Sequence, residues 1–171
     1  MIAILNPIIE AGVHTIMQQT YTEEEQIAYI RDFPARGVFY VALANDGRGR
    51  AHPAGNDPAP ARILGMQSVE PIPSTSPATF AHVGDISTFV APVAHRTGVG
   101  RALSHATIKA AWDAGFHKIM AGVRADNPGA VAFYRSVGFR LIGTARRHAR
   151  VRDRWIDEVM LEMLRGEETT S

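Results

Sequence analysis

The sequence contains no cysteine and has almost no excess of charge of one sign. Without cysteine, disulfide bonds, thiolate metal ligands and a cysteine nucleophile are excluded, so packing alone must hold the fold together. A formal net charge of +1 provides no broad basic field of the kind that draws a protein onto nucleic acid or an anionic membrane. We therefore expect neither a nucleic-acid partner nor a membrane partner.

The start of the chain lacks the features of a leader or an anchor. Residues 1–12 are apolar but include Asn6, Pro7 and Glu10, have no basic leader and no small-residue cleavage site, and are too few to span a bilayer. The simplest expectation is a soluble, cytoplasmic protein. At 171 residues, 46% of them hydrophobic, residues 1–171 are expected to form a single domain, with a polar tail at 166–171.

Apolar spacing predicts how the chain is organised. Side chains at helical intervals from Ile2 to Val13 predict that it opens in a helix, and Thr22 with Glu25 has the form of a capping box before a second helix. Strands are expected at 38–44, 62–72, 80–91, 118–123, 139–147 and 154–163, and further helices at 98–114 and 127–137. The Gly/Pro/Asn-rich residues 45–60 and the Pro/Ser-rich residues 73–77 are expected to be loops. This order predicts an α+β fold.

The first segment with chemical potential joins the strand 80–91 to the helix 98–114. Backbone amides at a helix start can converge on an anion, glycines allow close approach, and arginines add positive charge, so a pyrophosphate cradle is one interpretation and simple packing is the other. A Walker loop and a dinucleotide fingerprint are both excluded, because neither Gly-Lys-Ser/Thr nor the required third glycine is present. The residues concerned are His95, Arg96, Thr97, Gly98, Val99, Gly100 and Arg101.

The second segment is a helix that begins at Asn127 and carries Tyr134 in its middle. By itself it is equally well explained as a capped helix with a core tyrosine. Together, in this order and separated by one helix and one strand, the two segments resemble the GNAT N-acetyltransferase superfamily. The first matches Arg/Gln-x-x-Gly-x-Gly/Ala, with His95 in place of Arg or Gln. The second matches Asn-x-x-Ala-x-x-Phe-Tyr-x-x-x-Gly-Phe.

The closing strand narrows the resemblance. Residues 154–157, Arg-Trp-Ile-Asp, together with Met160, look like the ending of phosphinothricin acetyltransferase-like enzymes, and the likeness runs from the first residues to about Leu164. Members of that group usually begin with a strand before the first helix, which is expected to be missing here. The resemblance implies a mixed, mostly antiparallel central sheet flanked by helices, with a β-helix-β core that binds acetyl-CoA.

The resemblance also implies an activity and roles for individual residues. It implies direct attack of a neutral amine on the acetyl group of acetyl-CoA, with an amino-acid-like small molecule as acceptor. Thr88, Phe89 and Val90 would pair their backbone with the pantetheine arm, and Asn127 would help to hold the cosubstrate. Tyr134 would lie near the leaving sulfur and act as the acid.

The catalytic base is expected to be Asp85, which stands where the similar enzymes have a glutamate. Glu70, His82 and a water chain remain alternatives. The side chains of Glu70 and His82 come from strands that are expected to flank the acceptor. The histidines show no ligand spacing, so no metal is expected.

Other functions and partners also stay open. A protein or peptide acetyltransferase and a non-catalytic acyl-CoA-binding module are the alternative functions, and a homodimer through the closing hairpin or a sheet edge is compatible with the pattern. Four arginines at 146, 150, 152 and 154 would share one strand face, which favours a solvated face, an acidic acceptor or the CoA phosphates.

Overall fold

The computed structural model describes residues 1–44, 62–73 and 78–166. The loop expected at 45–60, nearly all of the one at 73–77 and the tail after Gly166 lie outside the described residues. Within them the elements follow the order α1 (Ile2–Ala11), α2 (Glu23–Arg31), β1 (Val38–Leu43), β2 (Ile63–Pro71), β3 (Val83–Val90), η1 (Pro92–Ala94), α3 (Val99–Asp113), β4 (Lys118–Arg124), α4 (Pro128–Ser136), β5 (Arg140–Val151) and β6 (Arg154–Leu164).

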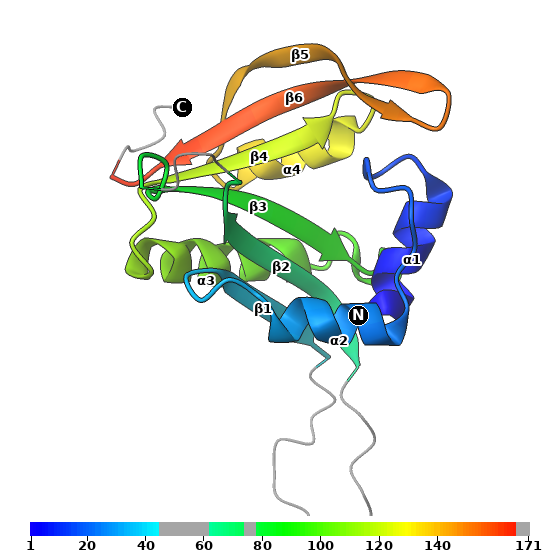
Figure 1. The fold of residues 1–171 in the computed structure, drawn as a ribbon, viewed down its shortest axis with the longest axis horizontal. Helices are drawn as coiled ribbons and strands as arrows, with labels where there is room; N and C mark the ends of the chain where they lie inside the picture. Colours follow the sequence, from blue (N-terminus) through cyan, green and yellow to red (C-terminus); the bar gives the residue numbers. More distant parts are fainter. Residues whose placement is uncertain (45–61, 74–77, 167–171) are drawn as a thin grey trace, which may run out of the picture.

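The strands form one six-stranded sheet in the order β1-β2-β3-β4-β6-β5 (Figure 1). Every neighbouring pair is antiparallel except β3 and β4, which are parallel and are connected through α3. A parallel pair requires a crossover, and α3 provides it. The predicted α+β fold, with its antiparallel meander, its β-helix-β unit and its closing hairpin, is therefore confirmed.

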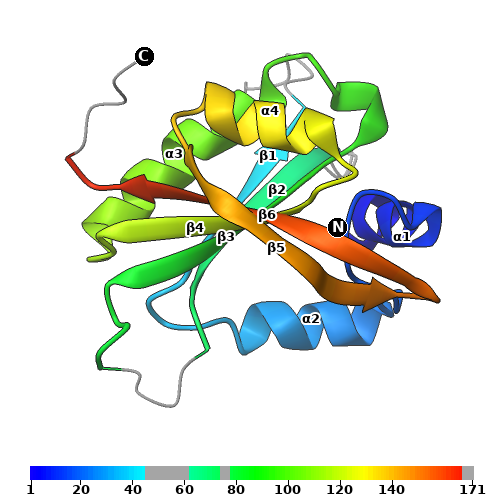
Figure 2. The same ribbon diagram turned by 90° about the horizontal axis from the view of Figure 1, so that it is seen from above.

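Helices cover the two faces of the sheet unequally, with α3 and α4 on one face and α1 and α2 on the other (Figure 2). The main core lies under α3 and α4, where Phe116, Ile119 and Leu161 are completely buried. Burial of each such side chain contributes roughly 1.5–3 kcal/mol. Two smaller apolar clusters lie under α1, around Ile4 and Ile9. The sheet thus packs its larger core against α3 and α4 and two smaller clusters against α1.

Strands β3 and β4 separate partway along their length. Their pairing runs from Val83 opposite Lys118 to Asp85 opposite Met120 and then stops, although β3 continues to Val90 and β4 to Arg124. Figure 1 shows the two arrows diverging beyond this point. The fork leaves backbone groups of both strands without a neighbouring strand, and it positions the site.

The local predictions at helix ends are confirmed. Thr22 and Glu25 form both bonds of the capping box on α2. The helix at 98–114 is one residue shorter at each end, because Gly98 is its N-cap, with φ of 91°. No helix among residues 1–44, 62–73 and 78–166 is both long and apolar enough to cross a membrane.

Two strand predictions need correction. β3 begins at Val83 rather than at residue 80, because a turn that closes through the bond from Val83 N to Phe80 O precedes it. β5 extends to Val151, and its pairing with β6 is shifted between Ala145 and Ala149. Arg147 takes a positive φ within this bulge and Arg152 another in the hairpin turn, so the four arginines do not form one regular strip.

Candidate active site

The fork between β3 and β4 exposes backbone groups that could pair with an extended ligand. Just after β3, Ala91 N donates to Leu64 O (2.8 Å), and at its start Val83 O accepts from Ile72 N (3.5 Å). The backbone N–H and C=O groups of the odd-numbered residues therefore point toward β2. Because backbone direction alternates along a strand, the groups of Thr88 and Val90 face the fork. Thr88 and Val90 therefore direct their backbone groups into the fork, whereas Phe89, which lies between them, directs its own to β2.

The loop before α3 presents a helix N-terminus close to this edge. Arg96 has φ of 62° and Gly98 φ of 91°, and the chain enters α3 at Val99 without a side-chain cap. Thr97 Oγ1 donates to Ala94 O (2.7 Å), which fixes the turn. In this first turn, the backbone amides of Val99, Gly100 and Arg101 donate no hydrogen bond to any residue that the structure describes. Free amides and the helix dipole favour an anion here.

The two glycines of the loop have different reasons to be there. A Cβ on Gly98 would meet no atom within 4 Å, so the space beside it is open to a ligand. A Cβ on Gly100 would come within 3.0 Å of Phe133 Cε2, so its neighbour is α4. The absence of a side chain at Gly100 therefore makes room for Phe133 of α4 rather than for a ligand.

His95 and Arg101 take different positions around the loop. The His95 ring places Nε2 3.0 Å from Val90 O, the carbonyl at the end of β3. Arg96 and Arg101 are exposed beside the start of α3. The positive charges available to an anion are thus those of Arg96 and Arg101, while the His95 ring contacts the backbone carbonyl at the end of β3.

Tyr134 reaches the fork from α4 and is buried. Its hydroxyl lies 2.9 Å from Thr88 Oγ1, which accepts a bond from Gln67 Nε2 (2.7 Å), and the same Nε2 donates to Ser104 Oγ (3.0 Å). Burial raises the pKa of Tyr134 to about 12, and the nearby Asp85 charge adds to the rise. The phenol therefore stays protonated at neutral pH.

Asp85 lies at the base of the fork, as the last residue of β3 that pairs with β4. Its side chain is exposed, yet burial by the surrounding protein raises its pKa to about 6, and the charges of Glu158 and Glu70 raise it further toward that value. A carboxylate at the bottom of an open cleft combines these two properties. At pH 7 most Asp85 side chains are ionised.

Asp85 and Tyr134 approach the fork from opposite faces of the sheet. Glu70, which is paired with Asp85, lines a pocket on the α1 and α2 face, whereas Thr88 contacts Tyr134 on the α3 and α4 face. Since successive strand residues alternate between faces, positions 85 and 88 point in opposite directions. A group held between the diverging strands would thus have the carboxylate on one side and the phenol on the other.

The alternative bases occupy different positions. Glu70 is on β2 directly opposite Asp85, where Tyr29 Oη donates to its Oε1 (2.6 Å). His82 lies outside β3, in the turn before it, and its carbonyl accepts from the amides of His117 and Lys118 at the closed end of the fork. Glu70 is therefore near Asp85, and His82 is at the end of β3 that lies away from Tyr134.

Asn127 is the N-cap of α4, and its Oδ1 accepts from Ala130 N (3.2 Å). Its position at the end of β4 places it on the far arm of the fork from Thr88. Among residues 1–44, 62–73 and 78–166, no three His, Asp or Glu side chains converge as metal ligands.

A pocket of about 210 Å³ lies between the β2 and β3 strands and the helices α1 and α2. Its apolar wall is formed by Leu5, Met17, Phe39, Met66 and Phe89, and Tyr29, Ser68, Glu70 and Ser87 provide polar atoms. Asp85 does not line the pocket, but Glu70, its partner across the sheet, and Ser87, two residues farther along β3, do. Its volume is that of a small molecule.

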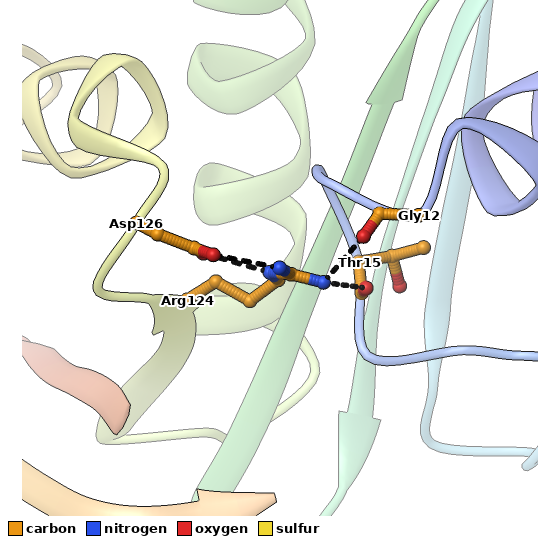
Figure 3. Close-up of polar contacts among 4 residues, drawn as sticks. All are labelled: Gly12, Thr15, Arg124 and Asp126. Carbon is orange, nitrogen blue, oxygen red and sulfur yellow. Dashed lines mark hydrogen bonds and ion pairs between the residues drawn. The ribbon is translucent and has the colours of Figure 1, made fainter. Parts of the chain in front are cut away.

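The sequence analysis missed Arg124, a buried arginine at the end of β4 (Figure 3). Its Nε and Nη2 donate to the two oxygens of Asp126 at 2.8 Å, and its Nη1 donates to Gly12 O (2.8 Å) and Thr15 O (3.1 Å). It thereby ties the segment after α1 to the fork. The nearby Asp126 was a sequence signal for the ion pair, but the carbonyls more than 100 residues away were not.

The open space at Gly98 leads to a prediction. We expect Gly98→Val to raise the KM for acetyl-CoA about tenfold or more, the change that about 1.4 kcal/mol of lost binding produces, because the side chain would fill that space and valine would strain the loop at a φ of 91°. Steady-state kinetics at varied acetyl-CoA measure it. Gly166→Val is the matched control, since Gly166 also has positive φ (82°) and open space around it. An equal effect of both variants on KM would contradict a ligand site at Gly98.

Known proteins similar to this chain identify its family. The family model described as Acetyltransferase (GNAT) domain matches residues 63–160, which include both arms of the fork and the loop before α3. Mycothiol acetyltransferase of Pseudarthrobacter chlorophenolicus is 40% identical over 81 residues, which are 46% of this chain and 24% of that protein. The chain thus spans about a quarter of the length of this curated relative.

Solved structures share the fold across nearly the whole chain. Ribosomal-protein-alanine N-acetyltransferase from Brucella melitensis matches with a TM-score of 0.78 and 23% identity, over 95% of this chain and 91% of the other. A phosphinothricin acetyltransferase from Sinorhizobium meliloti, in complex with acetyl-CoA, matches with a TM-score of 0.79 and 20% identity, over 99% and 83%. Because the family model covers more than half of the chain, this protein belongs to the GNAT acetyltransferase family.

Proposed function

We propose that the protein transfers the acetyl group of acetyl-CoA to the primary amine of a small molecule. The observation that carries the proposal is the fork, where an exposed carboxylate with a pKa of about 6 and a buried, protonated phenol lie on opposite faces of two diverging strands. An acyl transfer to an amine needs both groups, one to accept a proton and one to stabilise the leaving thiolate.

The chain's own residues fit acetyl-CoA as the cosubstrate. The pyrophosphate would bind the free amides of Val99 to Arg101, beside the open space at Gly98, with Arg96 and Arg101 as counter-charges. The pantetheine arm would add as a strand to the backbone groups of Thr88 and Val90. Asn127 would close the site from the other arm. Acetyl-CoA supplies the activated acetyl group.

Asp85 has the pKa that its proposed role requires. An alkylamine with a pKa of about 10.4 is almost entirely protonated at neutral pH and cannot attack a thioester. Asp85 would take the proton, directly or through one water, as the nitrogen forms its bond to the acetyl carbon and the carbon–sulfur bond breaks. Its raised pKa makes it a better base than an ordinary carboxylate.

Tyr134 is suited to stabilise the departing sulfur. Thr88 Oγ1 already accepts from Gln67, which leaves its own proton free for the Tyr134 oxygen and the phenol proton free to point into the fork. With a pKa of about 12, Tyr134 is a weaker acid than a thiol, whose pKa is about 8.5. We therefore propose that it donates a hydrogen bond to the sulfur as negative charge develops there.

Removing the phenol hydroxyl gives a direct test of this role. We expect Tyr134→Phe to lower kcat about 100-fold with little change in the KM for acetyl-CoA, because only the developing thiolate loses its donor. Initial rates of CoA release measure the change. Tyr40→Phe is the matched control, since Tyr40 is 43% exposed on β1. Unchanged kcat in Tyr134→Phe would contradict the role.

The proposed function is tested by acetyl-CoA turnover with a panel of amines, an N-terminal peptide and a lysine peptide. Release of free CoA that depends on a small amine supports it. The resemblance implies an amino-acid-like acceptor, so amino acids, phosphinothricin and methionine sulfone belong in the panel. Turnover only with peptides would make the protein a peptide acetyltransferase, and saturable acetyl-CoA binding without any turnover would make it a binding module.

A further inference from the structure

The pocket on the α1 and α2 face has an apolar wall built from the sheet and from the segment that carries α1. Leu5 comes from α1, Met17 from the segment after it, and Phe39, Met66 and Phe89 from three neighbouring strands. No lysine, arginine or histidine side chain is among the described residues that line it. A wall of this kind binds hydrocarbon and offers a ligand carboxylate hydroxyl and amide donors but no cationic side chain.

The size of the pocket limits what can fill it. An apolar cavity of about 150 Å³ is large enough to bind benzene. At about 210 Å³, the pocket can take one aromatic ring with a short alkyl chain, or an aliphatic chain of similar volume. It is too small to take a folded peptide segment.

Glu70 forms the polar side of the pocket and is oriented by its neighbours. Tyr29 Oη (2.6 Å) and Ser68 Oγ (3.2 Å) both donate to Glu70 Oε1. The second oxygen, Oε2, accepts no bond from any residue that the structure describes. Glu70 is opposite Asp85 in the sheet, so an ammonium group near both would meet two carboxylates.

The charges around this position are negative. Glu158, whose side chain is only 13% exposed on β6, raises the pKa of Asp85 together with Glu70. The nearest basic side chains of β4 are already paired, Lys118 with Glu162 and Arg124 with Asp126. His148 Nε2 lies 3.3 Å from Glu158 Oε2 and is paired there as well. A carboxylate next to the acceptor amine would therefore meet repulsion, and no lysine, arginine or histidine side chain among the described lining residues offsets it.

The arginines at the β5 and β6 end do not supply that cation. Arg152 Nη2 donates to Glu10 O (3.1 Å), and Arg150 lies over the Trp155 ring at 5.7 Å. Neither residue lines the pocket. A regular strip of arginines would favour an acidic acceptor, but no arginine lines the pocket among the residues that the structure describes.

We infer that the acceptor is an apolar primary amine of arylethylamine size, with no carboxylate beside its amino group. The apolar body fills the pocket between α1 and β2, and the ammonium group lies against Glu70 and Asp85. This inference rests on the proposed function and departs from the amino-acid-like acceptor that the sequence resemblance implies.

The matched substrates 2-phenylethylamine and phenylalanine test the inference, because they differ only by the carboxylate. With wild-type protein and saturating acetyl-CoA, we expect kcat/KM for 2-phenylethylamine to exceed that for phenylalanine by about tenfold or more. We expect glutamate, phosphinothricin and putrescine to be poorer than 2-phenylethylamine. Equal or better turnover of any carboxylate-bearing acceptor would overturn the inference and leave the acetyltransferase function intact.

Binding separates this inference from the proposed function. Calorimetric titration of 2-phenylethylamine and phenylalanine into the protein with saturating CoA needs no turnover. Binding of the amine at least about tenfold tighter than the amino acid supports the acceptor class even if no acetylation is seen. Equal or tighter binding of phenylalanine contradicts it.

A charge introduced into the pocket wall gives an independent readout. Met17 is partly exposed and packs at the edge of the Leu5, Ile9 and Met66 cluster, so Met17→Lys places a cation at the pocket, and its melting temperature is measured beside that of the wild type. We expect it to reduce the preference for 2-phenylethylamine over phenylalanine about tenfold. Ile27→Lys is the control, because Ile27 is 58% exposed on α2 and does not line the pocket. An unchanged preference in Met17→Lys would contradict the assigned pocket.

Discussion

Replacement of Asp85 by asparagine is expected to lower kcat by about 100-fold to 10,000-fold, because the amide cannot accept the proton of the acceptor amine. In the wild-type protein, kcat/KM should fall as the pH drops below about 6, where Asp85 becomes protonated. Tyr134, Glu70 and Glu158 are the titratable groups around it. The variant should lose this acidic limb. Rates of CoA release between pH 5 and pH 9 measure both effects.

The same substitution is expected to make the protein more stable. The pKa of Asp85 is raised from 3.8 to about 6 in the fold, so the folded state binds its proton more tightly than the unfolded state does. The stability that this proton contributes is complete below pH 3.8 and is lost as the pH rises through 6. Asp85→Asn should therefore match the wild type near pH 4 and exceed it at pH 8.

The gain at pH 8 is expected to be a Tm increase of roughly 2–4 °C, the shift that about 1 kcal/mol of desolvation cost and solvent-screened repulsion produces in a domain of this size. Thermal unfolding at pH 4 and pH 8 measures it. Asp153→Asn is the control, because its side chain is 99% exposed in the β5 and β6 turn.

The activity of the same variant decides between the two candidate bases. If Asp85→Asn kept its activity while Glu70→Gln lost it, Glu70 would be the base.

Removal of the Arg124 side chain is expected to give the largest loss of stability. Arg124→Ala removes four hydrogen bonds and leaves Gly12 O and Thr15 O without their donor. The side chain is 3% exposed and that of Asp126 is 43% exposed, so water can solvate only the acid that remains. We expect a decrease of about 3 kcal/mol in the free energy of unfolding. Chemical denaturation measures it.

The position of Arg124 adds a kinetic expectation. It holds the segment after α1 through the carbonyls of Gly12 and Thr15 (Figure 3). The same segment carries Met17, which lines the pocket. Its loss should raise the KM for the acceptor more than the KM for acetyl-CoA. Arg31→Ala is the control, since its ion pair with Asp32 is exposed and should contribute less than about 1 kcal/mol. Similar losses in both variants would show that burial adds nothing to the Arg124 contacts.

Much of the fold could be predicted because its signals are local. The capping box of Thr22 and Glu25 and the N-cap Asn127 depend on residues within three positions of one another, and each is formed. β3 was expected three residues too early, because Phe80 has strand character but lies in a turn that β-propensity does not detect. The arginine strip failed because Arg147 and Arg152 leave the regular strand geometry.

By itself, the sequence determined the family, the order of the elements and the identity of the residues around the fork, because motif spacing and helix signals are properties of neighbouring residues. Only the tertiary structure decided what surrounds them. The pairing of β3 with β4 stops at Asp85, the Glu70 and Glu158 charges meet there, and Arg124 binds carbonyls of a segment over 100 residues away. These are contacts between distant parts of the chain, and they set the pKa of Asp85 and the shape of the pocket.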